Sequence, residues 1–175
     1  MVARSVTVAL GLLAGLARLG TAQDVQPFSE SADTRYFDFW EGTWHQVVGG
    51  AIDTTRTIFR VRRDVHPAAF VEEWRMVIGP TRMRATALRA WDKTAGRWMY
   101  TWVSDNGLYQ VWEGRKVGEH WFIYREFDIQ GDRYLSRQAW IPDGADRLIR
   151  ISERSDDGGK TWTLRFREVY QRAAP

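Results

Sequence analysis

Cysteine is absent from this sequence of 175 residues. Its absence excludes disulfide bonds, cysteine-ligated metal sites and thiol catalysis. The fold must therefore be stabilised by packing and hydrogen bonding alone.

An excess of charge of one sign is missing as well. The chain has 25 basic and 22 acidic residues, but Arg4 and Arg18 fall in an N-terminal segment that we expect to be removed. Subtracting these two leaves 23 basic against 22 acidic residues, which is nearly neutral. Nucleic-acid binding calls for a one-sided basic patch, so we predict no nucleic-acid partner.

The N-terminal residues 1–22 have the three-part layout of a secretory signal peptide. Arg4 precedes an apolar run from Val6 to Leu16, and small residues lead to Ala22. The run is too short to span a bilayer, so a retained membrane anchor is the weaker interpretation. We expect cleavage after Ala22, a polar leader over residues 23–35, and a periplasmic or secreted protein without a stable membrane span.

No long helical period occurs in residues 36–172. Ten short segments instead alternate aromatic or β-branched residues with polar ones, which is the pattern of β-strands. Clusters of Gly, Asp, Asn and Pro separate most of them by two to five residues, so consecutive strands should pair antiparallel. The expected strands are Thr43–Val48, Thr55–Arg62, Ala69–Gly79, Thr81–Asp92, Gly96–Val103, Leu108–Gly114, Glu119–Ile129, Arg133–Ile141, Arg147–Ser155 and Thr161–Arg172.

Ten antiparallel strands joined by short turns leave two exposed edges unless the sheet closes on itself. We therefore predict an all-β domain over residues 36–172, folded as an antiparallel up-and-down β-barrel of about ten strands. A two-sheet sandwich is the alternative.

The segment Ser155–Leu164, SDDGGKTWTL, fits the Asp-box pattern Ser-x-Asp-x-Gly-x-Thr-Trp of sialidase-type propellers. A propeller needs a copy in each blade, whereas this chain has one copy and no blade-length repeat. Asp157 and Trp162 are therefore predicted to stabilise a hairpin turn and not to catalyse glycoside hydrolysis.

The segment Phe37–Trp44, FDFWEGTW, resembles the Gly-x-Trp opening of lipocalin-like (calycin) barrels, in which the Trp plugs the closed end. With the later Trp-x-x-x-Trp and Asp-Gly-Gly-Lys-Thr-Trp segments, the chain from Tyr36 to Tyr170 is similar to a family of exported bacterial lipocalin-like proteins of unknown function. The resemblance implies a β-barrel with a mouth, and it supplies no catalytic residues. Calycin barrels often bind small, largely apolar molecules inside, which is an analogy of fold.

One face of each barrel strand should line the interior, and we assign the more apolar face to it. In the last strand this face runs from Trp162 through Leu164 to Tyr170. Charged groups on such faces need partners, because an unpaired buried charge costs several kcal/mol. An aromatic lining with a few polar groups suits a small apolar or amphipathic ligand. The predicted ligand-binding residues are Glu72, Trp74, Tyr100, Trp102, Gln110, Trp112, Arg125, Gln138 and Glu168.

Two other functions remain open beside ligand binding. Glu72 and Glu168 could serve a barrel enzyme as an acid–base pair, or a solid interior could make the chain a structural or interaction module. The histidines, His45, His66 and His120, lack metal-ligand spacing, so we predict no metal site and no cofactor. A haem ligated by an internal His120 is the weaker alternative.

Overall fold

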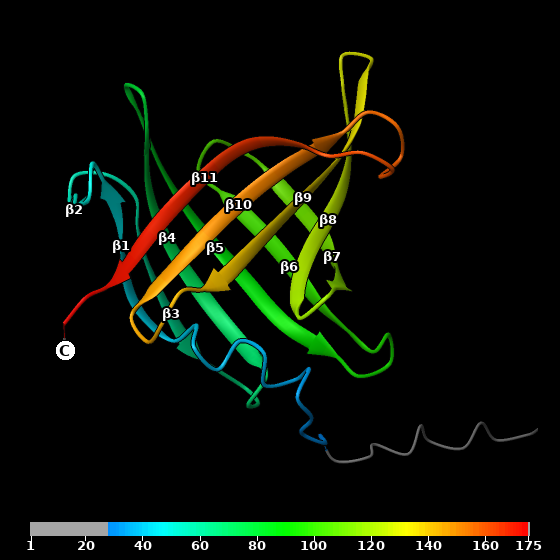
Figure 1. The fold of residues 1–175 in the computed structure, drawn as a ribbon, viewed down its shortest axis with the longest axis horizontal. Coiled ribbons are helices and arrows are strands. Elements are labelled where there is room, and N and C mark those ends of the chain that lie inside the picture. The colour runs from blue at the N-terminus through cyan, green and yellow to red at the C-terminus, as the bar shows by residue number, and fades with distance from the viewer. Residues whose placement is uncertain (1–27, 175) are drawn as a thin grey trace, which may run out of the picture.

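The computed structural model describes residues 28–174, and the predicted signal peptide (residues 1–22) lies outside the described residues. The described part forms an all-β fold (Figure 1). None of residues 28–174 belongs to a helix long and apolar enough to cross a membrane. The strands are β1 (Gly42–Val48), β2 (Ala51–Ile52), β3 (Ile58–Arg63), β4 (Ala69–Ile78), β5 (Thr81–Asp92), β6 (Arg97–Ser104), β7 (Tyr109–Val117), β8 (His120–Ile129), β9 (Asp132–Pro142), β10 (Arg147–Ser155) and β11 (Thr163–Arg172).

The strands form one antiparallel sheet that closes into a barrel. Neighbours along the chain pair from β3 to β11, and β1 pairs with both β3 and β11, where Gln46 lies opposite Tyr170. Ten strands thus complete an up-and-down barrel, while the two residues of β2 only extend the end of β1. The predicted barrel is confirmed, and the sandwich alternative is wrong because the first and last strands are paired.

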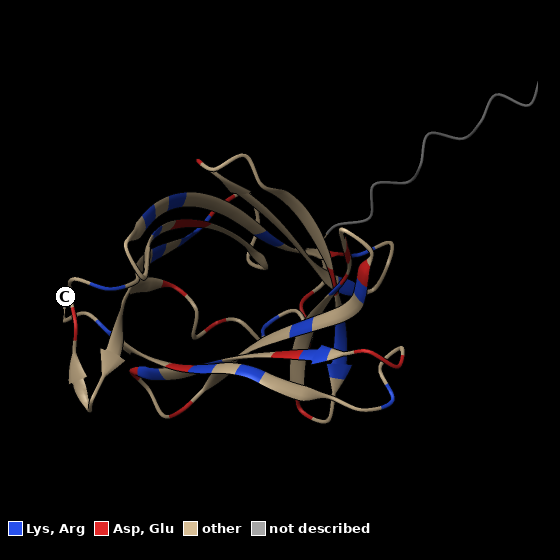
Figure 2. Ribbon diagram, turned by 90° about the horizontal axis from the view of Figure 1, so that it is seen from above, with Lys and Arg blue, Asp and Glu red and all other residues tan. Residues whose placement is uncertain are grey.

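The barrel has an inside because successive side chains of a strand point to opposite faces. In β6, Trp98, Tyr100 and Trp102 are buried, whereas the neighbouring Val103 faces outward and is 48% exposed. Few charged residues are buried, and Figure 2 shows basic and acidic residues interspersed around the barrel. Burial of the inward aromatic side chains is the main source of stability in a chain without disulfides.

The segment before β1 closes one end of the barrel, and we call residues 31–41 the N-terminal cap. The cap runs in consecutive turns beneath the strands (Figure 1), and its Trp40 is fully buried. Trp44 donates a hydrogen bond from Nε1 to the carbonyl of Trp40 (3.0 Å). The guanidinium carbon of Arg172 lies 4.3 Å from the Trp44 ring centroid, and Nη2 donates to the carbonyl of Phe39 (2.8 Å). The end of the last strand therefore holds the cap in place.

The Asp-box segment is the turn between β10 and β11. The Asp157 carboxylate accepts hydrogen bonds from the N–H groups of Thr161 (2.9 Å) and Lys160 (3.0 Å) and from the Ser155 hydroxyl (2.7 Å). These bonds, with that from the Thr161 N–H the strongest cause, hold the pKa of Asp157 well below its usual range. The role of Asp157 is local, as the single copy of the pattern predicts.

Trp162 lies on the outside of the barrel and not in its interior. It packs against Tyr124 with 5.7 Å between ring centroids, and the guanidinium carbon of Arg137 is 4.0 Å from its centroid. Leu164 also faces outward and is 55% exposed. The inner face assigned to this end of the last strand is wrong because the β10–β11 register shifts at Arg165, and the residues beyond a bulge change face.

The ladder between β7 and β8 ends halfway along the barrel. Its last paired residues are Glu113 and Tyr124, and beyond them residues 109–112 of β7 pair only with β6. Gly114 lies in the paired part of β7 next to this separation, and a Cβ added there would clash with the carbonyl oxygen of Trp98. Glycine in a strand permits such a close approach of two backbones.

Candidate functional site

A cavity of about 740 Å³ occupies the half of the barrel away from the N-terminal cap. It reaches the β4–β5 turn at Gly79 and the far end of β1 at Val48, whereas the cap joins β1 at its other end. The wall is more apolar than polar and comes from nine strands, β1 and β4 to β11. Its large apolar members include Met76, Met83, Trp102, Trp112, Phe127 and Phe166.

Most of the predicted ligand-binding residues lie on this wall. Glu72 and Trp74 face inward from β4 but are enclosed in the filled half of the barrel, below the cavity. Arg125 lies apart from the cavity. The predicted residues that line the cavity are Tyr100, Trp102, Gln110, Trp112, Gln138 and Glu168.

Arg125 is placed by the separation of β7 from β8. Its Nη1 donates a hydrogen bond to the carbonyl of Val111 (3.2 Å), in the part of β7 that lacks a β8 partner. The guanidinium carbon is 5.3 Å from the Phe127 ring centroid. Arg125 thus supplies a donor to an unpaired backbone segment.

Glu72 is the centre of a fully buried polar cluster in the filled half. Its Oε1 lies 2.9 Å from Arg89 Nε, and both side chains are 0% exposed. The indole N–H groups of Trp40 (2.8 Å) and Trp74 (2.9 Å) also donate to the carboxylate. Three donors satisfy a group that is very costly to bury alone. Glu72 is thus committed to the fold, which removes one member of the acid–base pair that the sequence suggests.

Aromatic rings surround the Arg89 guanidinium. Its carbon lies 4.4 Å from the ring centroids of Phe37 and Trp140 and 4.7 Å from that of Tyr100. Neither Nη atom has a hydrogen-bond partner among residues 28–174, so cation–π attraction takes the place of those bonds. Burial, followed by the charge of Glu72, raises the pKa of Tyr100 well above its ordinary value.

A second polar cluster lies where the filled half meets the cavity. Arg150 and Glu168 are cross-strand neighbours with 3.1 Å between Nη1 and Oε2. Arg150 Nη2 donates to Gln138 Oε1 (2.8 Å), and the Tyr170 hydroxyl donates to Glu168 Oε2 (2.8 Å). Burial raises the pKa of Tyr170, so its hydroxyl remains a donor at neutral pH. Arg150 Nε has no partner in the described part of the chain.

His120 contacts the N-terminal cap and does not point into the barrel interior. It precedes Trp121, which is buried on the inner face of β8, and so points to the other face. The Tyr36 hydroxyl lies 3.1 Å from His120 Nδ1. Burial raises the pKa of Tyr36 to about 12. The haem alternative rests on an inward His120, and this orientation removes that premise.

Sequence reasoning missed five polar residues of the cavity wall: Gln46, Arg56, Thr57, Arg150 and Arg165. Gln46 follows the inward Trp44 by two positions, so alternation could have revealed it. Arg150 lies opposite Trp140, and residues paired across strands share a face, but β10 itself has no aromatic pattern. Arg165 leaves no signal in the sequence because its position depends on the bulge.

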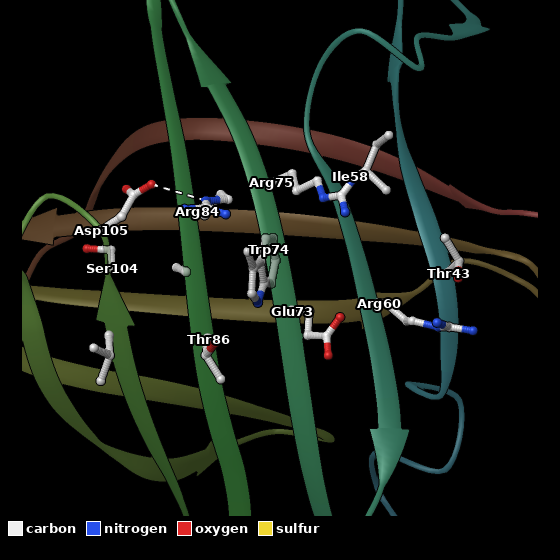
Figure 3. A pocket seen from close by; sticks show the side chains of 12 residues that line it. Thr43, Ile58, Arg60, Glu73, Trp74, Arg75, Arg84, Thr86, Ser104 and Asp105 are labelled. Atoms are coloured by element: carbon white, nitrogen blue, oxygen red, sulfur yellow. Dashed lines mark ion pairs between the residues drawn. The ribbon is translucent and has the colours of Figure 1, made fainter.

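A second hollow, of about 700 Å³, lies on the outer surface over β3 to β6 (Figure 3). The side chains of Arg60, Glu73 and Arg75 point outward there, and Arg84 pairs with Asp105 at 3.6 Å. The hollow lies on one outer face of the sheet, and most of its lining residues are charged or hydroxyl-bearing, so it would surround a ligand less completely than the barrel interior. The interior cavity is the better candidate.

No known protein family matches the sequence, and no curated protein matches it either. The site is therefore defined by its own geometry. It combines a filled, capped half, a cavity with aromatic walls, and a polar cluster between them.

Proposed function

We propose that this chain is an exported, lipocalin-like barrel protein that binds one small, largely apolar molecule with a polar end. The observation that carries the proposal is the interior cavity of about 740 Å³. Its volume falls in the range of about 300–1,000 Å³ typical of small-molecule pockets. One end of the barrel is closed by the cap, so the guest would enter from the other.

The distribution of polarity in the cavity supports an amphipathic guest. Trp102 and Trp112 are rigid aromatic walls that favour an apolar body. Polar side chains on the same wall, among them Gln110, Gln138 and Arg165, offer hydrogen-bond partners to the polar end.

Two features support the lipocalin-like assignment and export. Trp44 of the Gly-x-Trp segment packs at the closed end, as in the barrels that the sequence resembles, and Arg172 covers its ring. Residues 1–22 have the signal-peptide layout. Expression in a bacterial host should place the protein in the periplasm with Gln23 as its first residue. A protein retained in the cytoplasm with residues 1–22 intact would contradict the export proposal.

Binding is tested by titration with N-phenyl-1-naphthylamine, an uncharged apolar fluorophore. We expect saturable binding of one molecule per chain. Gln110→Trp should weaken it at least tenfold, because the larger side chain would fill part of the cavity. Tenfold corresponds to about 1.4 kcal/mol.

Val103→Trp is the matched control, since Val103 lies on the same barrel wall but points outward. It should bind the fluorophore as the unsubstituted protein does. If the folded protein shows no saturable binding, or if both substitutions weaken it equally, the interior is not the binding site.

A further inference from the structure

The β10–β11 ladder contains one residue too many on β11. Ser152 lies opposite Phe166, and Glu153 lies opposite Leu164, so Arg165 has no partner on β10. A bulge of this kind bends the strand and redirects a side chain. Here both Arg165 and Phe166 line the cavity, where strict alternation would place only one of two consecutive residues.

The bulged arginine is the cation of the cavity wall that lacks a counter-charge. The charged residues lining the cavity are Arg56, Arg150, Arg165 and Glu168. Glu168 neutralises Arg150 at 3.1 Å, and Arg56 lies 3.5 Å from an oxygen of Asp53. Arg165 forms no ion pair with any residue between 28 and 174 and lies over the Tyr134 ring, 5.7 Å from its centroid.

We propose that the cavity selects a monoanionic amphiphile of the carboxylate type, whose acidic group Arg165 binds at the mouth. The proposal rests on the function proposed above and adds the charge of the ligand. One uncompensated positive charge on the wall matches one negative charge on the guest. A guanidinium presents two parallel N–H donors to a carboxylate. Arginine is therefore a better partner for a carboxylate than lysine, whose ammonium group is a point charge.

The position of Arg165 also determines how the ligand lies. An acid held at the mouth leaves the apolar body to extend inward, between Met76, Trp102 and Phe127 and toward the Arg150–Glu168 pair. The acidic group then stays partly hydrated, so binding avoids the large cost of burying a charge.

Three probes with the same ten-carbon chain test the proposal: decanoate, 1-decanol and decyltrimethylammonium. Each competes with N-phenyl-1-naphthylamine at pH 8, where a carboxylic acid is ionised. We expect decanoate to bind at least tenfold more tightly than decanol, and the ammonium probe most weakly. Raising the salt from about 0.05 M to 0.5 M should weaken decanoate alone, because salt screens exposed charges.

Arg165→Gln should remove the tenfold preference for decanoate and leave the affinity for decanol unchanged. Arg167→Gln is the matched control, because Arg167 lies two residues along β11, is exposed, and does not line the cavity. It should keep the preference. Equal binding of decanoate and decanol, or equal losses from both substitutions, would overturn the proposal while the fluorophore still binds. Failure of every probe and of the fluorophore would reject the binding function itself.

Discussion

Four of the charged side chains inside this barrel form two pairs with different surroundings. Glu72 and Arg89 are sealed among aromatic rings below the cavity, whereas Arg150 and Glu168 border it. The alternation of β4 was enough to predict that Glu72 faces inward, and the cost of burying a charge was enough to predict a partner. The identity of that partner could not be predicted. It depends on the β4–β5 register, which places Ala87 opposite Glu72 and Arg89 diagonally across.

Replacing Glu72 with Gln should destabilise the protein by about 3–5 kcal/mol, because Arg89 would be left buried without its counter-charge. The amide also keeps only one oxygen for the two indole donors. Urea denaturation measures the loss.

A double-mutant cycle with Arg89→Met separates charge from packing. The double variant should lose less than the sum of the single losses, because it no longer contains an unpaired buried charge. Additive losses would show that the two side chains do not act as a pair.

The elements were predictable wherever they were regular. All ten predicted strands appear, because alternating aromatic residues and Gly- or Asp-rich turns are local signals that the barrel does not override. The irregularities were not predictable. The bulge at Arg165 and the separation of β7 from β8 near Gly114 arise from the pairing of distant segments. The bulge put Trp162 outside and Arg165 on the cavity wall, so it changed the candidate site.

The β10–β11 turn should make the stability of the fold depend on pH through Asp157. The folded state lowers the pKa of Asp157, so its contribution is complete above the ordinary value of about 3.9 and is lost as the pH falls toward the folded value. Asp157→Asn should therefore lower the melting temperature at pH 7, and the difference from the unsubstituted protein should shrink below about pH 4.

Thermal unfolding followed by circular dichroism between pH 7 and pH 2.5 measures this difference. Asp156→Asn is the control, because Asp156 makes an exposed pair with Arg154 and no turn hydrogen bonds. A difference for Asp157→Asn that stays constant with pH would rule out the charge of Asp157 as its source.

The interior of the whole molecule is divided between a filled half and a cavity. Aromatic packing between the cap and the barrel stabilises a fold without disulfides, and it uses Phe37, Trp40 and Trp98, all 0% exposed. The other half leaves about 740 Å³ unfilled. This unfilled space contributes no packing contacts to the fold, and the function proposed above assigns a ligand to it.

A matched pair of Phe→Ala substitutions tests this division. Phe37→Ala should cost about 3–5 kcal/mol in unfolding free energy, because it removes a fully buried ring beside Trp98 and Arg89. Phe127→Ala should cost less than half as much, because its ring already borders the cavity.

The order of the two variants should reverse for binding of N-phenyl-1-naphthylamine. Phe127→Ala removes part of the cavity wall, whereas Phe37 belongs to the cap and does not line the cavity. Urea denaturation and fluorescence titration of both variants measure the two effects. Equal stability losses with equal binding losses would mean that the two halves do not act separately.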